Sequence, residues 1–141
     1  MSVKYSAIFA RLRGAIARGL GLLLVRAGAP GWIWASLMQF GGGKVGEGIF
    51  DCLGGRDPVA ERARQYFAAA SAEVLPLLMA VARDHPSWEV RLGAFTALLW
   101  RKEPEALRFL AGLLRDRSWY TKGLAPGEAE EAPAWPKLLG L

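Results

Sequence analysis

Residues 83–95 read RDHPSWEVRLGAF, and a weaker copy, RDRSWYTKGLA, begins at residue 115. A shift of 32 residues carries the apolar pattern of residues 75–84 onto residues 107–116. A period of about 30 residues indicates a solenoid of helix pairs, because a single pair cannot bury its apolar face and must stack on its neighbours.

Apolar residues recur along the chain at helical spacing, and no stretch shows the sustained alternation of a strand. Glycine, serine and proline breaks separate the predicted helices, which cover residues 3–27, 32–40, 45–53, 58–70, 72–84, 87–101 and 103–116. The predicted fold class is therefore all-α: a small α-solenoid of antiparallel helix pairs with an extra hydrophobic, basic N-terminal helix. Its core is expected to contain Leu78, Val81, Phe95, Leu98, Leu110 and Leu113.

We expect three parts along the chain. Residues 1–56 form a basic, apolar helical segment with glycine-rich breaks, and residues 57–126 hold the repeats. Residues 127–141 form an acidic linker followed by a docking segment, in which Trp135 and Leu138 are expected to pack on the protein or on a partner.

A short signature recurs where one helix ends and the next begins. It reads Asp84, then Val90-Arg91, Gly93-Ala94 and Leu98. Over residues 57–124 this pattern resembles the HEAT-like repeats of the phycobilisome-lyase type. The resemblance implies a structural ladder between repeats, with Asp57, Arg64, Asp84, Arg91, Asp116 and Lys122 as its members. The alternative for its three cations is a basic stripe that contacts phosphates.

The helix over residues 3–27 carries two unusual features. Lys4, Arg11 and Arg18 are spaced by seven and share one strip. Gly14 and Gly21 belong to a seam of small residues, and each costs the helix about 1 kcal/mol relative to Ala, which indicates close approach of another helix. Large apolar residues fill a further face: Tyr5, Ile8, Phe9, Leu12, Ile16, Leu20 and Leu23. Such a helix is buried in the solenoid, paired in an oligomer, or partly sunk in a bilayer surface.

Charge is distributed unevenly along this chain of net charge +5. No acid precedes Glu47, whereas Glu128, Glu130 and Glu131 make the tail acidic. This asymmetry predicts a partner of negative charge or contact between the two ends of the chain.

Residues that could carry chemistry are few. Cys52 is the only cysteine, which excludes an intrachain disulfide and a Cys-based zinc site, and we expect a buried, inert thiol. His85 is the only histidine and is expected to be a solvated loop residue. FGGGKVGEG, residues 40–48, fails as a phosphate-binding loop because Met38 and Val45 replace the required Gly and Ser/Thr, so we expect an interhelix linker. We predict no catalytic residues, no metal site and no cofactor.

The expected function is a non-enzymatic protein-interaction scaffold or accessory subunit, with a protein partner or a homo-oligomer. A nucleic-acid-binding module is the alternative, and peripheral association with an anionic membrane surface is third. The longest uncharged run, residues 27–43, is shorter than the roughly 20 residues of a membrane span. We therefore expect a cytoplasmic protein, with a position at the membrane periphery as the alternative. Asn is absent and Gln occurs only at Gln39 and Gln65, which is typical of a thermophile or of a GC-rich genome.

Overall fold

A computed structural model of the chain describes residues 16–55, 58–116 and 118–119, with residues 40–47 as backbone. The first helix, described over residues 16–27, is followed by α2 (Gly31–Ile49), the 3₁₀ helix η1 (Phe50–Leu53), α3 (Pro58–Ala69), the 3₁₀ helix η2 (Ala72–Val74), α4 (Leu75–Asp84), α5 (Trp88–Arg101) and α6 (Pro104–Leu114). These described residues contain no strand, and the predicted all-α fold class is confirmed.

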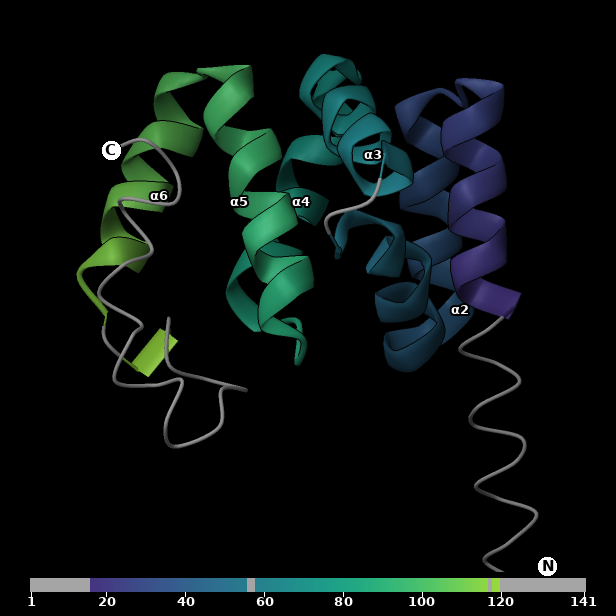
Figure 1. Ribbon diagram of the computed structural model, residues 1–141, viewed down its shortest axis with the longest axis horizontal. Helices are drawn as coiled ribbons and strands as arrows, with labels where there is room; N and C mark the ends of the chain where they lie inside the picture. The colour runs from purple at the N-terminus through teal and green to yellow at the C-terminus, as the bar shows by residue number, and fades with distance from the viewer. Residues whose placement is uncertain (1–15, 56–57, 117, 120–141) are drawn as a thin grey trace, which may run out of the picture.

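Two helix pairs, α3–α4 and α5–α6, stack side by side. The chain bends by 112° between α3 and the segment that combines η2 and α4. Helix α3 contacts α5, and α4 contacts α6, so corresponding helices of the two pairs lie next to each other. Figure 1 shows the first helix at one end of the long axis and α6 at the other, as expected for a solenoid.

The first helix ends where the sequence predicted. Gly28 has a left-handed φ of 65°. Its N–H donates to the Val25 carbonyl at 3.1 Å, and the Ala29 N–H donates to the Leu24 carbonyl at 3.0 Å. This paired bonding satisfies the last carbonyls of a helix and favours glycine at the turn.

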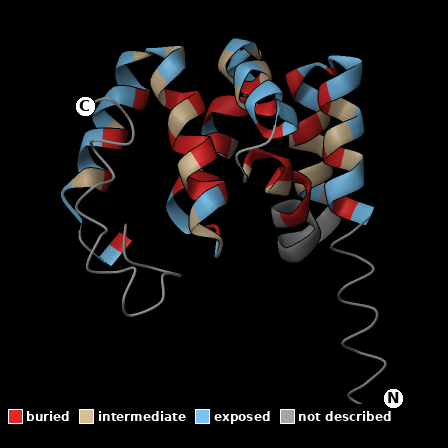
Figure 2. Cartoon of the chain, viewed as in Figure 1, coloured by how far each residue is buried: buried red, intermediate tan, exposed pale blue. Residues whose placement is uncertain are grey.

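The core lies between the stacked helices, as the buried inner faces in Figure 2 show. The prediction for the repeats is confirmed, since one buried cluster contains Leu78, Val81, Phe95, Leu98, Leu110 and Leu113. Nearer the first helix the core is aromatic. The Trp34 ring lies 4.7 Å from Phe67 and 5.4 Å from Phe50, measured between centroids. The Trp34 indole N–H donates to the Tyr66 hydroxyl at 2.8 Å, which satisfies its polar group inside the protein.

The linker predicted at residues 40–48 is wrong, because these residues lie inside the continuous 19-residue helix α2. Close packing on the first helix offers a physical reason. A Cβ on Gly48 would lie only 2.7 Å from the Cβ of Ala17, and a Cβ on Gly21 would overlap the carbonyl oxygen of Ile49. Glycine lowers helix propensity, but here it allows two helices to approach closely, and tertiary packing outweighs propensity.

The two faces of the first helix have opposite environments. Ala17, Gly21 and Val25 are buried against the rest of the protein. Ile16 and Leu23 are each 62% exposed, although they belong to the large apolar stripe of the sequence. The small residues therefore face inward, whereas Ile16 and Leu23 of the large apolar stripe face solvent and Leu20 is partly packed against the core.

We expect Gly21→Ala to destabilise the protein, because its new methyl group would force the first helix away from the Ile49 carbonyl. The matched control is Gly19→Ala in the same helix, since a Cβ there meets nothing within 4 Å. That control should stabilise the protein by up to about 1 kcal/mol through helix propensity. Denaturant titration measures both, and equal effects of the two substitutions would contradict the close helix contact.

Leu110→Ala should reduce the free energy of unfolding by about 2–5 kcal/mol, as is usual for a buried Leu. Leu110 is 3% exposed, whereas Leu107 on the same helix is 40% exposed. Leu107→Ala is therefore the control and should change the stability far less. If the Leu110→Ala variant were as stable as the control, Leu110 would not be part of the shared core.

Candidate interaction surfaces

Arg91 is the most deeply buried charged residue in the described part of the chain. Its Nη1 donates to the carbonyl oxygens of His85 at 2.7 Å and Pro86 at 3.2 Å, and its Nη2 donates to the Trp119 carbonyl at 3.4 Å. The carbonyls that follow a helix carry partial negative charge and have no partner within the helix. The guanidinium therefore joins the end of α4 to residue 119. Burial lowers the pKa of Arg91, but a guanidinium remains charged in proteins.

Two further arginines bind backbone carbonyls in the same manner. Arg64, which precedes Arg91 by one repeat, donates from Nη1 to Gly55 at 3.1 Å and to Leu53 at 3.4 Å. Arg101 donates to the carbonyls of Phe67 and Ala70, at 2.8 Å and 2.6 Å, where α3 ends. Its Nε also binds the Glu103 carboxylate. These cations act as structural donors to the ends of helices.

The acidic residues of the predicted ladder lie in other environments. Asp84 is exposed and forms an ion pair with Arg83 at 2.9 Å. Asp116 accepts hydrogen bonds from Ser118, at 3.0 Å from the backbone N–H and 2.6 Å from the hydroxyl, and these bonds lower the pKa of Asp116. The structure thus places the Arg91 guanidinium on carbonyl oxygens rather than on the Asp84 carboxylate. Asp57 and Lys122 lie outside the described residues.

His85 is buried at 6% exposure, so the prediction of a solvated loop residue is wrong. Its Nδ1 accepts the Ser87 backbone N–H at 3.0 Å, which leaves the ring proton of the neutral imidazole on Nε2. That Nε2 lies 2.9 Å from the Asp51 carboxylate and donates to it. Sequence reasoning missed this contact because the two residues are 34 positions apart. The imidazole joins η1 to the turn before α5.

Cys52 is buried, as predicted. Burial raises the pKa of its thiol to about 12, and the S–H donates to the Ile49 carbonyl at 3.4 Å. A thiol with this pKa is almost entirely protonated at neutral pH and is a poor nucleophile. Among the described residues, no three His, Cys, Asp or Glu side chains lie close enough together to hold a metal ion.

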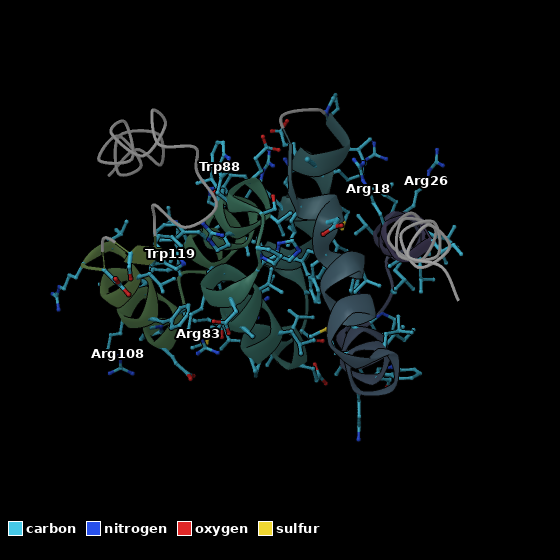
Figure 3. All side chains as sticks on the ribbon, turned by 90° about the horizontal axis from the view of Figure 1, so that it is seen from below. Arg18, Arg26, Arg83, Trp88, Arg108 and Trp119 are labelled. Carbon is cyan, nitrogen blue, oxygen red and sulfur yellow. The ribbon has the colours of Figure 1, made fainter. Side chains whose placement is uncertain are left out.

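Two residues predicted for binding are described, and they have different environments. Gly21 packs inside the protein. The sequence predicted that another helix approaches the small-residue seam closely, and at Gly21 that helix is α2. Arg18 is exposed on the first helix, and Figure 3 shows it extending to the same side as Arg26. The other predicted binding residues, Lys4, Arg11, Gly14, Trp135 and Leu138, lie outside the described residues.

Large apolar side chains reach the surface on two separate elements. One is the outward face of the first helix, with Ile16 and Leu23. The other is the surface of α4 and α6. There Leu77 and Phe109 occupy equivalent repeat positions and are half-buried, and Leu107 is exposed on the other side of α6 from Phe109, with Arg108 between them. We call the second the α4–α6 surface.

Comparison with known proteins gives one match. The family model for HEAT repeats matches residues 53–125, a stretch that includes α3 to α6. Neither a curated protein nor a solved structure matches the chain.

None of the described helices is both long and apolar enough to cross a bilayer alone. The bent pair of Pro58–Ala69 with Ala72–Asp84 meets the length and composition of a span, and only those.

Arg91→Lys should lower the free energy of unfolding by about 2–4 kcal/mol, because a single ammonium cannot reproduce three bonds from a planar fork. The matched control is Arg62→Lys on the exposed side of α3, which should change the stability by no more than about 0.5 kcal/mol. Chemical denaturation compares the two variants. Equal stability would show that the guanidinium geometry of Arg91 is dispensable.

Proposed function

Since the chain belongs to the HEAT-repeat family, we propose that it is a non-enzymatic protein-interaction scaffold or accessory subunit. HEAT repeats generally mediate protein interactions, and stacked helix pairs present extended surfaces suited to that role. The proposal concerns this chain as a binding module for another protein.

The proposal rests on one observation: the polar side chains inside the protein bond to other groups of the fold. Arg64 and Arg91 bind backbone carbonyls, and His85 binds Asp51 and a backbone N–H. Cys52 is held as a protonated thiol. The polar groups that catalysis would need are thus engaged in holding the helices together, which favours a role for the exterior helix faces.

Among those faces, we assign partner binding to the α4–α6 surface. Leu77 and Phe109 repeat at equivalent positions of helices that contact each other, so their half-exposed side chains belong to neighbouring helix faces. Arg108 is exposed on α6, next to Leu107 in the sequence. Apolar side chains beside a cation suit an amphipathic helix of a partner with acidic residues at its margin.

The nucleic-acid alternative is less well supported. It assigned Arg64, Arg91 and Lys122 to a basic stripe, but Arg91 is fully buried and Arg64 donates to backbone carbonyls. Phosphate contacts require exposed cations, and each neutralised phosphate adds to the salt dependence of binding. Two of the three proposed cations are therefore engaged within the fold.

The test compares two double variants of equal charge change. Leu107→Asp with Arg108→Glu alters the α4–α6 surface, and Val59→Asp with Arg62→Glu makes matched changes at exposed positions of α3. Partners co-purified with the native protein are identified, and their affinity for each variant is measured by calorimetry. We expect at least a tenfold loss for the first variant, since an exposed apolar side chain and a cation are both replaced by acids. The α3 variant should bind as the wild type does.

Equal binding of both variants would place the partner elsewhere and contradict the assignment to α4 and α6. A native protein that purifies with nucleic acid and no protein, in a salt-sensitive complex, would contradict the scaffold itself.

A further inference from the structure

One side of α6 is exposed where the equivalent side of α4 is covered. A shift of 32 residues places Leu75 on Leu107 and Ala82 on Leu114. Leu107 is 40% exposed, whereas Leu75 is 8% exposed. Leu114 is half-buried, whereas Ala82 is fully buried. Helices α5 and α6 follow α4 in the stack and contact it, so among the described residues α6 lacks the cover that α4 receives.

This side of α6 is apolar and has cations beside it. Leu107, Ala111 and Leu114 are spaced by four and three and lie along one side of the helix, which we call the Leu107 face. Arg108 and Arg115 are exposed, are spaced by seven and lie next to that face. Figure 3 shows Arg108 extending outward from α6. An occupant of the Leu107 face is therefore an apolar segment with acidic residues at its margin.

Trp119 anchors the chain to the stack after α6. It is the equivalent of Trp88 one repeat earlier, and its ring stacks on Phe95 of α5 with centroids 5.7 Å apart. Its indole N–H donates to the Ala82 carbonyl of α4 at 2.7 Å. The match to HEAT repeats also extends past α6, to residue 125. The residues after Trp119 thus start from a fixed point at this end of the solenoid.

The C-terminal segment has the composition that the Leu107 face requires. A shift of 32 residues carries Pro104 onto Pro136 and Leu107 onto Leu139, so residues 135–141 repeat the pattern with which α6 begins. Three acids precede this segment: Glu128, Glu130 and Glu131. Because α4 and α6 contact each other, the next copy of their pattern is expected on the free side of α6.

The contact is within reach of the same chain. Residues 120–134 join Trp119 to the segment and can span up to about 50 Å, whereas the 11 residues of α6 measure only about 16 Å. A tethered segment meets its binding face at an effective concentration of roughly millimolar. This tether favours the segment of the same chain over that of a second copy.

We propose that residues 135–141 bind the Leu107 face of the same chain, with Leu139 beside Leu107 and with the preceding glutamates beside Arg108 and Arg115. The Leu107 face belongs to the α4–α6 surface, so the bound segment competes with the partner assigned to that surface. This competition rests on the proposed function, whereas the contact itself does not.

Disulfide trapping in the full chain tests the contact. Leu107→Cys with Leu139→Cys is compared with Glu105→Cys with Leu139→Cys, because Glu105 is exposed on another side of α6 only two residues away. Cys52 is retained, since a buried and protonated thiol does not compete with the new ones. The bond requires a close approach of the two cysteines, with Cα atoms about 4.4–6.8 Å apart.

With glutathione disulfide as the oxidant, we expect the intramolecular disulfide to form at least about tenfold faster at residue 107 than at residue 105. Mass spectrometry of the alkylated protein measures both rates. Both substitutions on α6 are at exposed positions, and circular dichroism and thermal melting establish that each variant is folded.

The cations are tested in the first cysteine pair. Adding Arg108→Gln and Arg115→Gln should slow trapping by roughly 1.5- to 5-fold per cation, the range expected for an exposed ion pair. The matched control adds Arg26→Gln and Arg62→Gln, which are exposed on the first helix and on α3. That control should trap as fast as the parent pair.

The competition is tested without added cysteines. Leu138→Asp with Leu139→Asp should raise the affinity for a co-purified protein partner by about threefold or more, because release of the segment leaves the α4–α6 surface available. Calorimetry compares this variant with the wild type. Unchanged partner affinity contradicts the competition.

Equal trapping rates at residues 105 and 107 overturn the proposal. A disulfide-linked dimer as the main product also overturns it, because the segment would then lie on a second copy. A partner that ignores Leu107→Asp with Arg108→Glu, while trapping succeeds, contradicts the proposed function and still supports the intramolecular contact.

Discussion

Backbone carbonyls at the ends of helices impose the constraint on which this fold depends. A solenoid ends a helix at every turn, and the carbonyls left there need donors when stacking covers them. Arg91 meets this need for His85 and Pro86, and its second Nη extends the contact to Trp119. The Trp119 indole N–H in turn donates to the Ala82 carbonyl at 2.7 Å, and its ring stacks on Phe95. Arg91 and Trp119 thus both donate to carbonyls at or just after the end of α4.

A second constraint sets how closely the helices stack. Gly21 lies against the Ile49 carbonyl between the first helix and α2, and Gly93 lies against the Leu53 carbonyl between α5 and η1. In both places a methyl group would overlap backbone, which cannot move as a side chain can. Glycine therefore appears inside helices despite its low propensity, because the neighbouring backbone occupies the volume of a Cβ. The arginines and glycines act together. The arginines supply hydrogen-bond donors for the helix ends, and the glycines permit the close approach that buries those ends.

The sequence predicted the parts of the fold that depend on local pattern. Helices α3 to α6 and six residues of their core follow from apolar periodicity and from breaks such as Ser71 and Pro86, which depend only on neighbouring residues. The continuous helix α2 was missed because local propensity treats three successive glycines as a break, whereas the decisive packing involves a helix elsewhere in the chain. The His85–Asp51 contact was missed for a related reason, since no spacing rule links side chains 34 residues apart.

The surface could be predicted only in part from the sequence, because residues of the same type can be buried at one position and exposed at another. Arg91 and Arg18 are both arginines on helices, but the first is fully buried on carbonyls and the second is exposed. The net charge of +5 therefore overstates the cations available to a partner. The large apolar residues of the first helix are a second example. Their spacing is typical of a core face, but the small residues of that helix pack inward. Ile16 and Leu23 of that stripe are each 62% exposed, because Ala17 and Gly21 make the close contact with α2 and turn the other side of the helix outward. Apolar spacing alone therefore predicts that a helix has an apolar face, whereas the volume available between two backbones decides which face is buried.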